Sequence, residues 1–195
     1  MKKLNIILLT ACIAGLFAGC NNAAKDSKEK ADSANSAVDS TEKTNPNNNI
    51  ALSAADARFA VEAANGGMAE VELGNLAQQK ATNARVKEFG AMMVMDHSKA
   101  NAEMKQLAAS KKITLPDSIS ADEKKLKADL SAKSGAEFDK AYVEAMVKDH
   151  KEDIKAFEDA GKQVKYPEMQ AFIAKTLPVL QKHLDAIQKI HDQIK

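Results

Sequence analysis

The chain has 195 residues, a formal net charge of +1 and an aromatic content of 4%. Charges of both signs are interleaved along it and few aromatic rings are present to stack on bases, so no nucleic-acid partner is expected. Tryptophan is absent, and no stretch after the N-terminal segment is apolar enough to cross a membrane.

The first twenty residues resemble the signal peptide of a bacterial lipoprotein. Two lysines precede an apolar run, residues 4–17, that is too short to span a bilayer permanently. The run leads into Leu-Phe-Ala-Gly-Cys, residues 16–20, which resembles a lipobox. The resemblance implies cleavage before Cys20 and acylation of that cysteine. A plain secretory signal that ends by chance in a cysteine is the alternative.

The lipobox predicts a cell-envelope protein that is attached to the membrane by its acyl chains. Residue 21 is Asn and not Asp, which favours the outer membrane, with the protein facing the periplasm. The other cysteine lies inside the signal peptide, so the mature chain has no thiol for a disulfide.

Residues 21–51 are predicted to be a disordered polar tether. Asn, Ser, Ala, Lys, Asp, Glu and Thr dominate this segment, so it has too little apolar surface to offset the entropy lost on ordering. The remaining residues, 52–195, are long enough for one compact domain with its own core.

The domain at 52–195 is predicted to be all-α, because it lacks sustained period-two alternation and has few helix breakers. Ser53 with Asp56, and Ser134 with Glu137, have the spacing of capping boxes, and Pro167 suits a first helical position. The predicted long helices are 53–81, 83–111, 134–161 and 167–195, with a short helix at 120–132. These elements predict an antiparallel four-helix bundle with an extra helix in the crossover between its second and third helices.

Two glycines support the pairing of the first two long helices. Gly74 and Gly90 lie about eight residues before and after the first turn, so they fall at one level. Glycine in a helix interior costs up to about 1 kcal/mol relative to alanine, and close backbone approach would offset that cost.

A Met-x-x-Asp-His motif occurs twice, at residues 93–97 and 146–150. The i, i+4 spacing puts Met93 and His97 on one core-facing side of their helix, and Met146 and His150 likewise. Asp96 and Asp149 lie at the edge of these faces. Glu70 is a carboxylate on the apolar face of the first helix, level with His97, and a buried glutamate needs a partner.

Two interpretations of these residues remain open. In the first, Asp96–His97 and Asp149–His150 are hydrogen-bonding pairs that fix helix register, and Glu70 bonds to His97. In the second, the protein binds copper or iron, and the proposed ligands are Glu70, His97, His150, Met93 and Met146. Thioether and imidazole together suit copper.

The fourth long helix contributes His183 to an apolar face, but its level differs from that of His150. Counted from the helix ends, the two residues are roughly 9 Å out of level, at 1.5 Å per residue. A compact site that joins all three core histidines to Glu70 is therefore not expected.

Catalysis is not expected, because the chain lacks a nucleophile elbow, a phosphate loop, a dinucleotide fingerprint and a His-Glu-x-x-His motif. The carboxylate that di-iron bundles place three residues before each ligand histidine is also missing. A non-enzymatic role in binding or support is predicted, without a cofactor in the first interpretation, and no motif identifies a protein partner.

Four segments in order resemble the bacterial ferritin-like family known as domain of unknown function 4142. They are GGMAEVELGNLA (66–77), FGAMMVMDH (89–97), YVEAMVKDH (142–150) and TLPVLQKHL (176–184). The resemblance implies a ferritin-like four-helix bundle in an envelope protein, and it implies no activity.

Overall fold

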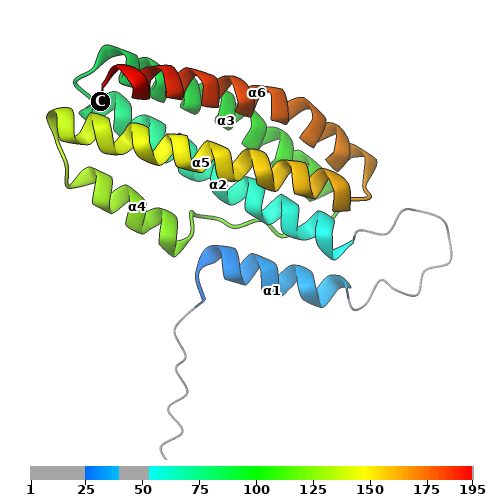
Figure 1. The fold of residues 1–195 in the computed structure, drawn as a ribbon. Helices are drawn as coiled ribbons and strands as arrows, with labels where there is room; N and C mark the ends of the chain where they lie inside the picture. Colours follow the sequence, from blue (N-terminus) through cyan, green and yellow to red (C-terminus); the bar gives the residue numbers. More distant parts are fainter. Residues whose placement is uncertain (1–24, 40–52, 195) are drawn as a thin grey trace, which may run out of the picture.

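The computed structural model describes residues 25–39 and 53–194, and the regular structure of these residues is helical (Figure 1). The helices are α1 (Ser27–Asp39), α2 (Ala54–Lys80), α3 (Ala84–Ser110), α4 (Ala121–Ser131), α5 (Gly135–Gln163) and α6 (Pro167–Gln193). The predicted all-α class is confirmed over these ranges, and none of these helices is long and apolar enough to cross a membrane. The predicted signal peptide, with Cys20, lies outside the described residues.

The segment predicted to be a disordered tether contains helix α1, so that prediction is wrong for Ser27–Asp39. This helix packs against α2. The side-chain amide of Asn35 donates to the carbonyl of Thr114 at 2.9 Å and accepts from the Thr114 amide at 2.8 Å. Lys28 forms an ion pair with Glu62 on α2 at 2.7 Å. Polar tertiary contacts, which composition does not reveal, hold this helix in place.

The four long helices form two antiparallel pairs, α2 with α3 and α5 with α6, while α1 and α4 lie along the outside (Figure 1). The predicted close approach of α2 and α3 is confirmed at their glycines. A Cβ atom built on Gly74 would lie 2.6 Å from the carbonyl oxygen of Gly90, and one on Gly90 would lie 2.7 Å from that of Gly74. Only hydrogen fits at either position.

Helix starts agree with the sequence at one of the two predicted capping boxes. The Asp56 amide donates to Ser53 Oγ at 3.2 Å, and the Ser53 amide donates to the Asp56 carboxylate at 2.9 Å. The box predicted at Ser134 is wrong, because Ser134 makes no side-chain cap hydrogen bond and Glu137 pairs with Lys133 instead. Helix α5 also continues beyond Gly161, its predicted end, to Gln163.

The core has two apolar clusters with a polar layer between them. One cluster, near the α2–α3 turn, includes Leu73, Phe89, Met93, Tyr142, Met146 and Ile187; the other, toward the opposite end, includes Phe59, Met104, Phe157, Phe172 and Leu180. Each long helix places a buried glutamate or histidine between the two groups. These residues are Glu70, His97, His150 and His183.

Candidate functional site

The polar layer takes one residue from each long helix: Glu70 from α2, His97 from α3, His150 from α5 and His183 from α6. Their exposed fractions are 1%, 5%, 0% and 1%. The ring centroids of the three histidines lie 5.2 to 6.2 Å apart. The expectation that His183 lies out of level with this group is therefore wrong.

Two features of the α5–α6 pair bring His183 into level. Helix α5 ends two residues later than predicted, which reduces the offset between His150 and His183 to roughly 4.5 Å along the helix axis. Side chains on a helix also lean toward its N-terminus. Because α5 and α6 are antiparallel, His150 leans away from their connection and His183 leans toward it, which closes the remaining gap.

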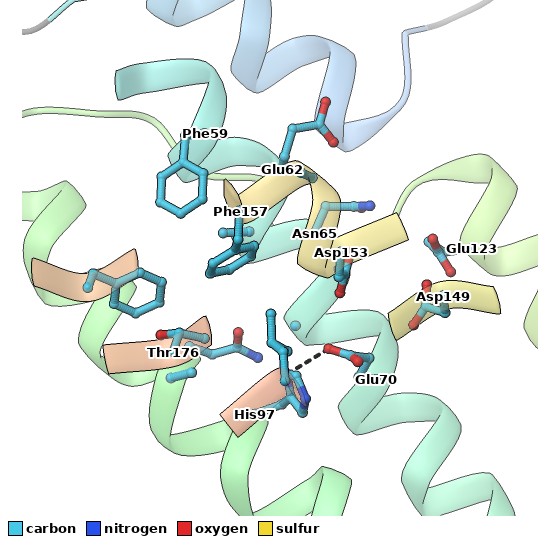
Figure 2. Close-up of a pocket in the computed structure, with 18 residues that line it drawn as sticks. Phe59, Glu62, Asn65, Glu70, His97, Glu123, Asp149, Asp153, Phe157 and Thr176 are labelled. Atoms are coloured by element: carbon cyan, nitrogen blue, oxygen red, sulfur yellow. Dashed lines mark ion pairs between the residues drawn. The ribbon is translucent and has the colours of Figure 1, made fainter. Parts of the chain in front are cut away.

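His97 and Glu70 face each other across α2 and α3, as the count from the turn predicts. Nδ1 of His97 lies 2.6 Å from Oε2 of Glu70, the contact marked by the dashed line in Figure 2. On its other side, Nε2 of His97 lies 3.3 Å from Nδ1 of His183.

The aspartates next to the repeated histidines do not pair with those histidines. Asp96 instead accepts a hydrogen bond at 2.9 Å from Nε2 of His183, on α6. His150 bonds through Nδ1 to the carbonyl of Met146 in its own helix, at 3.0 Å. Asp149 lines a cavity. The hydrogen bonds that the register interpretation placed within each Asp-His pair therefore lie elsewhere.

The hydrogen bonds fix which ring nitrogen of His150 carries a proton. A carbonyl can only accept, so Nδ1 of His150 is the donor to Met146 and Nε2 carries a lone pair. Burial lowers the pKa of His150 to about 3, so the ring is neutral near pH 7. This lone pair faces Oε1 of Glu70 at 3.3 Å, and neither atom has a hydrogen-bond partner among the described residues.

All three histidines follow one pattern. One ring nitrogen of each contacts an oxygen: Glu70 for His97, Asp96 for His183 and the Met146 carbonyl for His150. A ring nitrogen from each histidine lies within 4.8 Å of one from the other two. Metal-ligating histidines typically use their second nitrogen in this way, which orients the ring and fixes its tautomer.

The protonation states suit metal binding. Burial lowers the pKa of His97 to about 4 and also lowers the pKa of His183. Neutral imidazole is the form that ligates metals, so all three rings are ready to bind near neutral pH. Burial, together with the charge of Glu123, raises the pKa of Glu70 well above its usual range.

A cavity of about 180 Å³ adjoins the polar layer. Figure 2 shows Glu70 and His97 at one side of it, with Asp149 and Asp153 of α5 and Glu123 of α4 nearby. Burial and the neighbouring Glu70 charge raise the pKa of Asp149, and the same causes raise the pKa of Asp153 to about 8. The cavity therefore gathers several carboxyl groups, and among the described residues neither Asp149 nor Asp153 forms an ion pair with a lysine or an arginine.

The sequence reasoning missed His183 as a member of the site, and it missed Asp153 and Glu123. The sequence does carry a signal for His183, because a histidine on an apolar helical face is predicted to point into the core. The two methionines of the metal hypothesis, Met93 and Met146, are fully buried within the apolar cluster one helical turn away from the histidines.

Comparison with known proteins identifies the family. The family model described as a domain of unknown function, DUF4142, matches residues 41–190. No curated protein and no solved structure matches the chain. Because the matched residues make up most of its length, the chain belongs to the DUF4142 family.

Proposed function

We propose that this protein binds a divalent first-row transition metal through His97, His150 and His183. The convergence of one ring nitrogen from each of three buried histidines carries this proposal. The second nitrogen of each ring is held by an oxygen, so the rings are oriented without the metal. The ligands would be Nε2 of His97, Nε2 of His150 and Nδ1 of His183.

Metal binding explains the unpaired atoms better than a role in helix register does. A buried network that serves register is expected to satisfy its polar atoms, because each unpaired one costs about 1–3 kcal/mol. Here Nε2 of His150 and Oε1 of Glu70 face each other at 3.3 Å without a hydrogen bond. A cation bound by the three histidines would accept the lone pair of His150 Nε2 and remove the cost of leaving that atom unpaired.

The set of ligand atoms limits which metal ions the proposed site would prefer. Three imidazole nitrogens suit Zn(II), Cu(II), Ni(II) and Fe(II), so the copper and iron of the sequence-based hypothesis remain within the proposed range. The revised ligand set replaces the thioethers of Met93 and Met146 with His183. This change favours a divalent ion over Cu(I), because thioethers are the softer ligands.

The proposed setting is a ferritin-like four-helix bundle held in the cell envelope by lipid on Cys20. Support for the bundle comes from the two antiparallel pairs, each helix of which supplies one residue to a central site. Support for the anchor comes from the lipobox-like residues 16–20. The proposed role is binding and not catalysis, because the chain lacks the catalytic motifs named above.

The test is metal analysis of the protein purified without chelator, followed by competition titrations with Zn(II), Cu(II), Ni(II) and Fe(II). We expect one metal ion per chain, lost in His97→Ala, His150→Ala and His183→Ala. His191→Ala is the matched control, since His191 lies on α6 two turns away and contacts Asp192 at 3.6 Å. Absence of tight binding of all four ions would return the histidines to a role in helix packing.

A further inference from the structure

The cavity side of the polar layer carries oxygen donors that the three-histidine site does not use. Glu70, Asp149 and His150 each place a ligand atom within 4.8 Å of the others. Asp153, one helical turn after Asp149, lines the same cavity. Oε2 of Glu70 contacts His97, which leaves Oε1, a buried atom with no hydrogen-bond partner in the described part of the chain, directed at this group.

These carboxylates lack positive partners. Among the described residues, neither Asp149 nor Asp153 accepts a hydrogen bond or forms an ion pair, although both are mostly buried. Glu123 adds a further carboxylate to the cavity wall. Buried carboxylates are normally paired or bound to a metal, so a cation bound between these carboxylates would compensate their charge.

Two glycines of α2, Gly66 and Gly67, allow side chains of the neighbouring helices to approach its backbone. A Cβ atom on Gly66 would lie 3.8 Å from the carboxylate of Asp153, so Asp153 packs directly against the α2 backbone. A Cβ atom on Gly67 would collide with the amide oxygen of Asn101, which lines the same cavity. The Gly-Gly pair thus brings two oxygen-bearing side chains, from α3 and α5, to the cavity.

We propose that Oε1 of Glu70 and the carboxylates of Asp149 and Asp153 form a second cation site, specific for a hard divalent ion such as Ca²⁺ or Mn²⁺. Oxygen-only donor sets prefer such ions, which retain bound waters, and the cavity of about 180 Å³ has space for these. The proposal concerns different ligand atoms from the three-histidine site, so either can fail without the other.

The protein supplies its own optical reporter for this site. It contains two tyrosines and no tryptophan. Tyr142 is fully buried on α5, two helical turns before Asp149, and burial, together with the charges of Glu70 and Asp149, raises the pKa of its hydroxyl. Tb³⁺ binds the same hard oxygen donors as Ca²⁺, and it emits when a nearby tyrosine is excited.

The experiment is a titration of the metal-free protein with Tb³⁺, read by tyrosine-sensitised emission and reversed with Ca²⁺. We expect saturable emission, at least tenfold weaker binding in Asp149→Asn/Asp153→Asn, and loss of emission in Tyr142→Phe but not in Tyr166→Phe. Glu144→Gln/Glu158→Gln is the matched control, because it removes two exposed acids from the same helix. The single variants Asp149→Asn and Asp153→Asn replace the double variant if its circular dichroism shows lost helix.

Three results would overturn the second site. They are no saturable Tb³⁺ binding, equal binding by the Asp149→Asn/Asp153→Asn variant and its control, or loss of Tb³⁺ binding in His183→Ala. The last would mean one shared site. Retention of Tb³⁺ by His183→Ala together with loss of its Zn(II) would support two sites, while Tb³⁺ binding without any transition-metal binding would refute the three-histidine site alone.

Discussion

Two layers of the core lie one helical turn apart and are equally buried, yet different interactions hold them. In the apolar layer, Met93 and Met146 are fully buried beside Phe89. In the polar layer, His97 and His150 occupy the next turn of the same helices. Apolar side chains need only close packing, whereas buried polar groups need a partner for each donor and acceptor.

The comparison separates stability from function. Met93, Met146 and Phe89 need only close packing, whereas among the described residues Glu70 Oε1 and His150 Nε2 of the polar layer are buried without a hydrogen-bond partner, as is the hydroxyl of Tyr142 in the adjoining apolar cluster. A fold that required only stability could carry apolar side chains in both layers, often at no loss. The polar layer therefore has a role that packing does not explain, and the following five experiments test that difference, from the largest expected effect to the smallest.

Truncation in the apolar layer should cost the most stability. Met146→Ala removes a fully buried side chain, and such changes reduce the free energy of unfolding by about 2–5 kcal/mol. Chemical denaturation of the metal-free protein measures this loss. Because Met146 contributes only its backbone carbonyl to the polar layer, the variant should still bind one transition-metal ion. Loss of metal binding in a folded variant would instead restore the thioether to the ligand set.

Saturating metal should stabilise the wild type through the polar layer. A ligand at 100 times its Kd adds about 2.7 kcal/mol to the free energy of unfolding. We expect this gain from Zn(II) in thermal or chemical denaturation of the wild type and its absence in His150→Gln. Without metal, the same variant should lie within about 1 kcal/mol of the wild type, since Nε2 of His150 has no hydrogen bond to lose among the residues that the structure describes. A large loss of stability without metal would show that the histidine serves packing.

The close contact of α2 and α3 belongs to the apolar layer and should be intolerant of a methyl group. Gly74→Ala would place Cβ 2.6 Å from the Gly90 carbonyl, so we expect a loss of about 1–3 kcal/mol in the free energy of unfolding. Gly161→Ala is the matched control in a helix, because its Cβ would make an ordinary 3.6 Å contact with Ile173. That change should be neutral or stabilising by up to about 1 kcal/mol.

Metal binding should release about one proton. Without metal, the contacts Glu70–His97, His97–His183 and His183–Asp96 each need a hydrogen, so the chain of four groups holds three protons. A metal bound to both imidazoles displaces the proton between them. Its affinity should therefore rise about tenfold per pH unit from about pH 5 to about pH 7. Calorimetry in buffers of different ionisation enthalpy counts the protons, and an unchanged affinity would contradict this arrangement.

The smallest expected effect is a fall in the stability of the metal-free protein as the pH rises from about 7.5 to about 9. Above about pH 7.5 the buried histidines, whose pKa values are lowered in the folded protein, are neutral in both the folded and the unfolded state and contribute nothing. The folded protein holds the proton of Asp153, whose pKa is raised to about 8 by burial and Glu70, while the unfolded chain has lost it. Stability should decline by about 1 kcal/mol, less in Asp153→Asn, as followed by thermal denaturation. A cation bound to Asp153 should reverse the trend.

The sequence predicts the elements of this fold better than it predicts their polar contacts. Local signals decide the helix starts, as at Ser53 and Pro167, and the glycines that face each other across α2 and α3 follow from their spacing. The pairing of Glu70 with His97 is predictable for the same reason, because a short turn fixes the level of both residues.

The remaining features depend on contacts between distant segments. The partner of Asp96 is His183 on α6. Counting residues from the predicted helix ends puts His183 out of level with His150, because neither the true end of α5 nor the tilt of side chains toward a helix N-terminus can be read from local sequence. Helix α1 depends on the double hydrogen bond between Asn35 and Thr114, which joins residues 79 apart in the chain. Composition alone indicates disorder in such a segment.

The docking of α1 shortens the linker that would join a lipid anchor on Cys20 to the folded domain. With the proposed lipid on Cys20 and with Ser27 starting a docked helix, six residues of chain lie between the two. Fully extended, that chain spans roughly 25 Å, whereas an undocked chain from Cys20 to Ser53 would span more than roughly 100 Å. With the proposed lipid on Cys20, the docked helix α1 would hold the domain close to the bilayer surface, and it would limit the distance from the membrane at which the proposed site meets metal ions.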